Sequence, residues 1–429
     1  ELAVGNFKVQ TGCGLLLGSG FSVGKNMALS TVSGQTQGLK PHSSTQEYGY
    51  LCGAGTTIGK GHTKYTLLAA WTPLDATVKG DTVIGSFKQD GFHRTGLEMS
   101  KRHNVRLGTM AANVRYSYRG FRIGTTFLAE KLSLPYKSHD RFTGISADFG
   151  LNRARYSVLA EISVLNGAPA VVASQTLRLP DGWSMNTVFR YYSPRYMAFH
   201  SNAIAESSVQ NEMGLLAGLA RKTRNLKING YADLFIHPEP RYGASERSNG
   251  TDLRMEADWR VGRRDELFAT ARFKSKQKDC RYTGRLEYCI TGRCRLRWTH
   301  QTLSGAELKT QIFYSRYDFI AEPISDGLAV TQSYSRCLLN GRLDLNLTAS
   351  VFSTDSYDSS ISAYETGLRY SFNFITLYGK GARAALTVRY RIGKNLQLHL
   401  NAGGTDYSDC DEIGSAHKED ISVQFIAKF

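Results

Sequence analysis

The last ten residues of the chain, Asp420-Ile421-Ser422-Val423-Gln424-Phe425-Ile426-Ala427-Lys428-Phe429, alternate between apolar and polar side chains. Positions 421, 423, 425, 427 and 429 are apolar, and the positions between them are polar except for Ile426. Successive side chains of a β-strand point to opposite faces of the sheet. This stretch therefore predicts a strand with one apolar face and one largely polar face.

The same period of two recurs far upstream, in residues 156–164, 226–236, 342–351, 384–392 and 396–402. Short groups of turn-forming residues separate such stretches, at 118–120, 151–153, 180–182, 262–265, 341 and 393–395. Longer irregular stretches cover 194–208 and 238–251. Short turns that alternate with long loops are typical of the two ends of a transmembrane barrel.

The chain has 429 residues and contains no run of 18 apolar residues, so a helical membrane span is excluded. A soluble β-sandwich would also alternate, but the pattern continues without a linker or a composition shift that would mark several sandwiches. We therefore predict an all-β fold: a transmembrane antiparallel β-barrel of about 18–22 strands. The strand parity is ambiguous between Lys276 and Gly305, so the count stays open.

We expect residues 1–429 to form a single barrel in the bacterial outer membrane, with residues 1–40 as a glycine-rich N-terminal segment. A barrel of this kind must be exported. The export signal is therefore expected to have been removed or to lie outside these residues, and an upstream periplasmic part to be absent with it.

The formal net charge is +16, which is typical of proteins with an anionic partner, although surface solubility alone also explains such an excess. Many cations fall on the polar face of the predicted strands. The predicted lumen-facing basic residues are Arg190, Lys227, Arg295, Arg297, Lys309, Arg342, Arg389 and Arg391. A lumen lined mainly by positive charge predicts a preference for anions.

Cys280, Cys289 and Cys294 lie close together in the sequence, and Cys289 and Cys294 flank a plausible turn, Ile290-Thr291-Gly292-Arg293. A local disulfide between Cys289 and Cys294 is therefore geometrically feasible. The spacing fits no zinc-binding pattern, so we predict no metal and no cofactor. The acidic residues Asp355, Asp358 and Glu365 suggest either a calcium site or a loop closed by Asx turns, and without EF-hand spacing the loop is favoured.

The glycine-rich stretch Gly5–Lys25 could cradle phosphate, but its spacing differs from that of a phosphate-binding loop. Glycines at a bend or at a close approach of two segments are favoured instead. Histidines are scattered along the chain, and no G-x-S-x-G setting accompanies them. We therefore predict that the chain is not an enzyme.

Gly5–Lys25 also resembles the "GDYR-x-x-x-GQGL-x-x-x-x-GF-x-x-GK" segment of a Bacteroidota outer-membrane family. Asp344–Asp358, followed by Ala363-Tyr364-Glu365, resembles the "F-x-TDSYD-x-x-x-x-AYE" block of that family, and 378–383, 406–409 and 413–415 extend the resemblance. Cys13 and Ser360 depart from the pattern. The resemblance implies a barrel that follows a periplasmic helix-hairpin-helix, competence-like segment described as DNA-binding. No such segment occurs in these residues, so no DNA-binding residue is carried over.

Two functions are consistent with these observations. One is a pore or conduit for anionic solutes, or for DNA as the resemblance suggests; the other is a plugged barrel that anchors other envelope proteins. The expected partners are outer-membrane lipids with lipopolysaccharide, the barrel-assembly machinery, an anionic solute or DNA, and other envelope proteins. The assembly machinery is expected to recognise a C-terminal signal formed by Phe425 and Phe429.

Overall fold

The computed structural model describes residues 1–19, 24–25, 38–43, 47–320, 322–370, 373–393, 395–408 and 416–427. Within these ranges the regular structure is almost entirely β-strand, and α2 (Gly96–Ser100) is an α-helix of five residues. No helix in these ranges is long and apolar enough to cross a membrane. Twenty-two strands join one sheet, and β20 and β21 form a separate two-stranded sheet. The predicted all-β barrel fold is confirmed.

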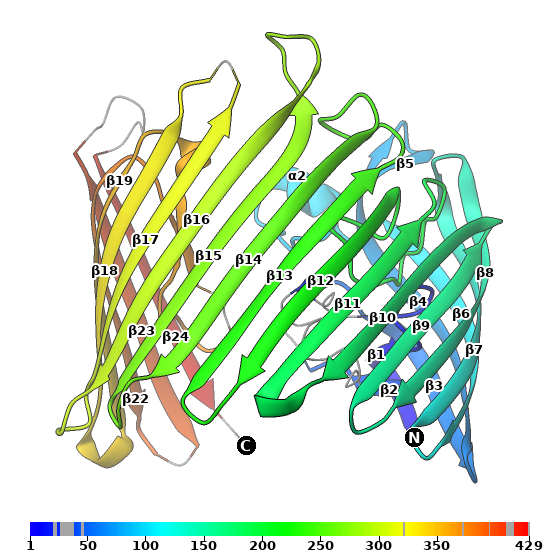
Figure 1. The fold of residues 1–429 in the computed structure, drawn as a ribbon, viewed down its shortest axis with the longest axis horizontal. Helices are drawn as coiled ribbons and strands as arrows, with labels where there is room; N and C mark the ends of the chain where they lie inside the picture. The colour runs from blue at the N-terminus through cyan, green and yellow to red at the C-terminus, as the bar shows by residue number, and fades with distance from the viewer. Residues whose placement is uncertain are drawn as a thin grey trace. The chain divides into compact units, whose positions relative to one another are not determined.

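The chain divides into two compact units, of which unit 1 comprises Glu1–Leu219 and Asp233–Arg241, and unit 2 comprises Ala220–Ala232 and Tyr242–Phe429. The strands of the first half are β1 (Leu2–Gln10), β2 (Gly38–Pro41), β3 (Leu51–Lys60), β4 (Thr63–Lys79), β5 (Val83–Lys88), β6 (Val105–Tyr118), β7 (Phe121–Tyr136), β8 (His139–Asn152), β9 (Tyr156–Leu165), β10 (Ala168–Arg178), β11 (Trp183–Tyr192) and β12 (Glu212–Lys222). In Figure 1 these strands run from blue to green.

The strands of the second half are β13 (Leu226–His237), β14 (Ser248–Arg260), β15 (Asp265–Asp279), β16 (Leu286–Gln301), β17 (Glu307–Phe319), β18 (Ser325–Leu338), β19 (Leu343–Thr354), β20 (Ile361–Tyr364), β21 (Phe374–Leu377), β22 (Lys380–Arg391), β23 (Leu396–Tyr407) and β24 (His417–Ala427). They run from green to red in Figure 1. Three short 3₁₀ turns, η1 (Pro180–Gly182), η2 (Leu339–Gly341) and η3 (Tyr357–Ser359), complete the regular structure.

Consecutive long strands pair in antiparallel fashion, as an up-and-down meander requires. In unit 1, β6 to β11 each pair with the next strand along the chain. In unit 2, β14 to β19 pair in the same way, and β22 to β24 continue the series from β19. The turns between them are tight: between β6 and β7, Arg119 and Gly120 both adopt positive φ, which two-residue hairpin turns need.

The apolar side chains lie on the face where the sequence pattern places them. On β7, Ile123 and Phe127 are about half exposed, whereas Thr126 and Leu128 on the other face are buried. On β24, Ile421, Val423 and Phe425 are 71%, 65% and 61% exposed. Exposed apolar faces on a large antiparallel sheet belong against lipid rather than water. Phe429, the other half of the predicted assembly signal, lies outside the described residues.

The predicted disulfide between Cys289 and Cys294 is wrong. Both residues lie on one continuous strand, β16, and both are free thiols. Cys289 is buried and Cys294 is exposed, because residues five apart on a strand point to opposite faces. The hairpin connections lie instead at 280–285 and 302–306, which resolves the strand parity that the sequence left open.

Candidate functional site

Most of the predicted lumen-facing cations occupy polar-face positions on their strands. Arg190 lies on β11, Lys227 on β13, Arg295 and Arg297 on β16, Lys309 on β17, and Arg389 and Arg391 on β22. Arg342 differs from the prediction, because it lies in the turn between η2 and β19 rather than on the strand. Leu339, Asn340 and Gly341 all adopt positive φ there. The turn is therefore longer than the single turn residue Gly341 predicted, and Arg342 belongs to it.

Arg190 in unit 1 is fully buried and holds two buried carboxylates. Its Nε donates to Glu212 Oε1 at 2.5 Å, and its Nη1 and Nη2 donate to the two oxygens of Asp233 at 2.7 and 3.0 Å. The side chains of all three residues are 0% exposed. Charges this deeply buried persist only when each has a hydrogen-bonded partner of opposite sign.

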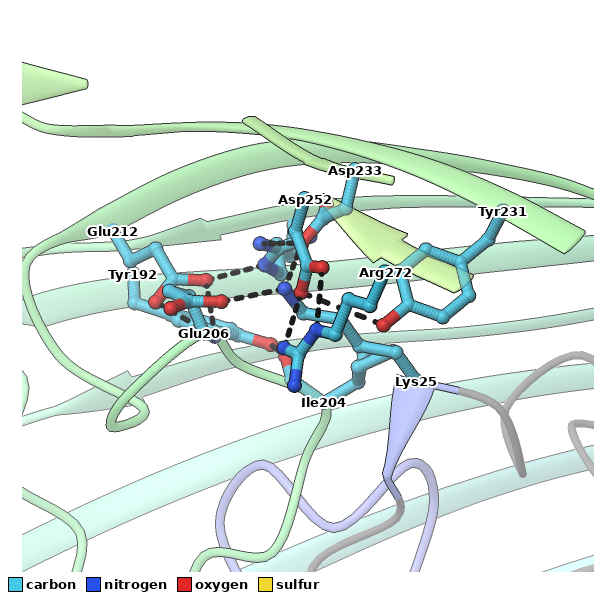
Figure 2. Close-up of polar contacts among 10 residues, drawn as sticks. Lys25, Tyr192, Ile204, Glu206, Glu212, Tyr231, Asp233, Asp252 and Arg272 are labelled. Atoms are coloured by element: carbon cyan, nitrogen blue, oxygen red, sulfur yellow. Dashed lines mark hydrogen bonds and ion pairs between the residues drawn. The ribbon is translucent and has the colours of Figure 1, made fainter. Parts of the chain in front are cut away.

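Two further charged residues extend this cluster toward segments that leave the sheet. Figure 2 shows the Lys25 ammonium directed at the carboxylates of Glu206 and Asp233, at Nζ–O distances of 2.5 and 2.7 Å. The backbone N–H of Glu206 donates to Glu212, and the hydroxyl of Tyr192 donates to the Ile204 carbonyl at 2.6 Å. The cluster therefore ties the connection between β11 and β12 to the polar face of the wall.

The glycine-rich segment after β1 packs against the polar face of unit 1 and binds a carboxylate of the wall. We call Thr11–Gly18 the N-terminal insert; all of its residues are buried. Backbone N–H groups of Cys13 and Leu15 donate to Glu161 Oε2 at 2.7 and 3.1 Å. Neighbouring backbone N–H groups that converge on one anion form a concave anion-binding site, a nest. Here the anion is a side chain of β9.

The favoured interpretation of these glycines, a close approach at a bend, agrees with the geometry. Gly12 and Gly14 adopt positive φ, and a Cβ at Gly12 would lie 2.6 Å from Glu161 Oε2. A Cβ at Gly14 would lie 1.9 Å from Asn202 Oδ1. Only glycine fits where the backbone meets the wall and the neighbouring loop this closely.

The connection between β11 and β12, residues 193–211, covers the same face of unit 1; we call it the loop insert. The Tyr196 hydroxyl bonds with the Leu15 carbonyl at 3.1 Å and with Ser163 at 3.0 Å. The backbone N–H of Asn202 donates to the Gly14 carbonyl. Burial lowers the pKa of His200 to about 4, so this imidazole is neutral at physiological pH. Beside the two inserts remains a cavity of about 570 Å³, lined partly by Tyr136, Phe199 and Gln210.

The attachment of the N-terminal insert can be tested through Cys13. Burial and the nearby Glu161 and Asp148 carboxylates raise the pKa of this thiol, so we expect slow labelling by a maleimide in the folded protein. Glu161→Leu removes the acceptor of two N–H groups and should speed Cys13 labelling roughly tenfold or more. Glu161→Gln keeps an acceptor oxygen and should have a smaller effect. Peptide mapping by mass spectrometry separates Cys13 from the other cysteines; equal rates in all three proteins would contradict this attachment.

In unit 2, the connection between β19 and β22 forms a third covering segment. Its strands β20 and β21 pair from Ile361↔Leu377 to Tyr364↔Phe374. Ile361, Ala363 and Leu377 pack in one buried cluster with three wall residues from β17 to β19: Phe313, Ala329 and Phe352. We call 355–379 the hairpin insert. It carries Asp355–Asp358 and Ala363-Tyr364-Glu365, which belong to the two blocks on which the family resemblance rests.

The hairpin insert is fastened to the wall by one buried ion pair and several backbone carbonyls. Arg383 on β22 donates to both oxygens of Glu365 at 2.9 and 3.0 Å. The Thr366 carbonyl accepts from Thr387 and Asn401, and the Gly367 carbonyl accepts from Arg389. Glu365 is thus engaged by arginine, and the described residues contain no cluster of three or more potential metal-ligating side chains.

The polar face of β14 to β17 in unit 2 carries the largest concentration of positive charge. Direct cross-strand partners share a face, and this face holds ten basic residues against six acidic ones. The basic residues are Arg254, Arg260, Arg272, Lys274, Lys276, Lys278, Arg293, Arg295, Arg297 and Lys309. The acidic residues are Asp252, Glu256, Asp258, Glu266, Glu287 and Glu307. The sequence analysis identified only Arg295, Arg297 and Lys309 of these cations.

Comparisons with known proteins gave structural similarities only, since no family model and no curated protein matches the chain. The outer-membrane OmpT of Vibrio cholerae is 6% identical, with a TM-score of 0.36 over 78% of this chain and 99% of that chain. An anion-selective porin from Comamonas acidovorans is 11% identical, with a TM-score of 0.36 over 66% and 89%. The copper transporter OprC is 9% identical, with a TM-score of 0.42 over 88% and 61%.

The exposed apolar side chains of the strands indicate where the protein resides. Long antiparallel strands with exposed apolar residues occur in both units, for example Phe127 and Ile145 in unit 1 and Leu296 and Val351 in unit 2. Such strands satisfy their backbone hydrogen bonds within the sheet and leave an apolar surface for lipid. The protein is an outer-membrane β-barrel.

Proposed function

We propose that the protein is an outer-membrane channel that prefers anionic solutes. The observation that carries the proposal is the excess of four positive charges on the polar face of β14 to β17, ten basic against six acidic residues. The opposite face of the same strands exposes Met255, Phe273 and Leu296. A low-dielectric wall that presents one sign of charge to water concentrates ions of the other sign.

The reversal potential of the reconstituted protein across a salt gradient in a planar bilayer tests this proposal. We expect anion preference in the wild type. Lys276→Glu with Lys278→Glu removes the excess of four charges, so the double variant should lose most of that preference. Arg263→Glu with Arg264→Glu makes the same charge change in the turn between β14 and β15 and serves as the matched control. Cation preference in the wild type would refute the proposal.

A second candidate function, a plugged barrel that anchors envelope proteins, is favoured by the inserts. In unit 1 the N-terminal insert and the loop insert are held by buried charges and by Glu161. If the wild type conducts no ions, the anchoring function becomes the better interpretation. Conductance that appears only in Glu161→Leu would indicate a channel that opens when the N-terminal insert leaves the wall.

Passage of DNA rests on the resemblance to the Bacteroidota family alone. The outcome that would favour it is an anion-selective conductance that long DNA blocks and short anions do not.

A further inference from the structure

Three arginines of unit 2 form a row across neighbouring strands. Arg254 on β14 is the direct cross-strand partner of Arg272 on β15, which is in turn the direct partner of Arg293 on β16. All three therefore share the polar face. Directly opposed side chains lie about 4.5–5.5 Å apart at Cβ, and like charges in such pairs destabilise a sheet. A row of three guanidinium groups thus requires negative charge close by.

The wall supplies two carboxylates for this row. Asp252 accepts from Nε and Nη2 of Arg272 at 2.8 and 2.7 Å, as Figure 2 shows. Glu256 accepts from Nη2 of Arg254 at 2.9 Å. Arg293 is exposed, and the structure gives it no ion pair within the described ranges. Arg293 therefore adds a positive charge for which the described residues give no ion-paired carboxylate.

Arg295, the next polar-face residue along β16, adds a fourth guanidinium. It donates to the side-chain oxygen of Gln311 and lies over the rings of Phe268 and Phe313, at 5.9 and 5.2 Å from their centroids. None of these partners is charged. Its positive charge adds to that of Arg293, one polar-face position away.

Two N–H donors of this group are buried without an acceptor. The Nε atoms of Arg254 and Arg295 are inaccessible to solvent, and neither has a hydrogen-bond partner among the residues that the structure describes. A buried donor without an acceptor costs stability, more so when it is charged. An oxyanion bound here would supply the negative charge that this group of arginines lacks.

We infer that Arg254, Arg272, Arg293 and Arg295 form a binding site for a tetrahedral oxyanion, the phosphate or sulfate group of a solute. This inference deepens the proposed anion channel and rests on it for the statement that the solute passes through. Neighbouring strands lie about 4.8 Å apart, so guanidinium groups on different strands need an anion whose oxygens point in several directions. A planar carboxylate fills one guanidinium fork, as Asp252 already does for Arg272.

Chloride and phosphate place different demands on this site. The attraction of chloride depends on local charge, so lysine and arginine attract it equally well. A phosphate group gains from the planar fork of arginine, which lysine cannot provide. Arg293→Lys therefore keeps the charge that governs ion preference but removes the geometry that governs oxyanion binding.

The experiment is a calorimetric titration of the purified full chain in detergent with inorganic phosphate, sulfate, glycerol phosphate and acetate. Arg293→Gln should weaken phosphate binding roughly tenfold or more, and Arg293→Lys by a similar factor. Arg391→Lys, an exposed polar-face arginine on β22 outside the row, is the matched control and should bind phosphate like the wild type. Glycerol phosphate distinguishes a solute that carries a phosphate ester from free phosphate and sulfate. Acetate should bind least.

The outcomes separate this inference from the proposed channel. Phosphate binding that is absent in the wild type, or unchanged in Arg293→Lys, overturns the oxyanion site, even if bilayers show anion preference. Phosphate binding that is lost in Arg293→Lys, in a protein that conducts no ions, supports the site and refutes the channel. Acetate bound as tightly as phosphate also overturns the inference, because the site would then recognise charge alone.

Discussion

Replacing Arg190 with alanine is expected to destabilise unit 1 by about 3–5 kcal/mol, as the removal of one partner from a buried ion pair does. The substitution leaves Glu212 and Asp233 in place, both 0% exposed, and removes three of their hydrogen bonds. Lys25 still contacts Asp233. The cost arises from buried carboxylates that have lost their partner, not from the net value of the intact cluster.

The measurement is the fraction of heat-modifiable, folded protein against urea concentration after reconstitution. Arg195→Ala is the matched control: it removes an exposed arginine of the loop insert and should leave the curve unchanged. Arg190→Met combined with Glu212→Gln and Asp233→Asn removes the stranded charges as well, and should recover part of the loss. If Arg190→Ala unfolds at the same urea concentration as Arg195→Ala, Arg190 is not stabilising buried charge in the assembled barrel.

The sequence alone could predict the sheet because the barrel wall obeys a local rule. Alternation along β24 and tight turns such as Arg119-Gly120 depend only on neighbouring residues. The polar-face positions of Arg190, Lys227 and Arg389 follow from the same parity. A pattern that repeats along the chain requires no knowledge of distant contacts.

The inserts could not be predicted from this alternation, although two residues of the wall strands indicate that something covers the polar face. Leu159 on β9 and Phe352 on β19 are apolar residues at polar-face positions, where they break the alternation. Both are buried, and Phe352 packs in the cluster that holds the hairpin insert. Apolar residues on both faces of a barrel strand indicate that something covers the inner one. The sequence does not say which segment does so.

The site at which the glycine-rich segment binds Glu161 could not be predicted from the sequence. Its N–H groups bind Glu161, which lies 148 residues beyond Cys13 in the chain. No residue near Gly12 or Gly14 in the sequence indicates that Glu161 is the partner. The turn predicted at Ile290–Arg293 was wrong for a different reason. Gly292 lies within β16, and a Cβ added to it would lie 3.8 Å from the nearest atom, Arg316 Cβ, so a side chain would fit there. A glycine in a strand that has room for a side chain resembles a turn glycine in the sequence.

Val423→Arg is expected to cost about 2–4 kcal/mol, the range for a cation on the lipid face near the bilayer midplane. Val423 lies near the middle of β24, is 65% exposed and has Leu400 as its direct cross-strand partner. A guanidinium there would have to enter hydrocarbon or distort the bilayer to reach water. Ser422→Arg makes a similar change one residue earlier, where the side chain points to the polar face.

Outer-membrane fractions that are analysed with and without boiling measure folded, inserted protein for both variants. We expect Val423→Arg to lose most of the heat-modifiable form and Ser422→Arg to keep it. Similar losses in both variants would mean that β24 simply tolerates no added volume. Similar retention would mean that its exposed apolar face does not meet lipid. Only an asymmetric result follows from the alternation at the end of the chain, because the two positions differ chiefly in the face of the sheet on which they lie.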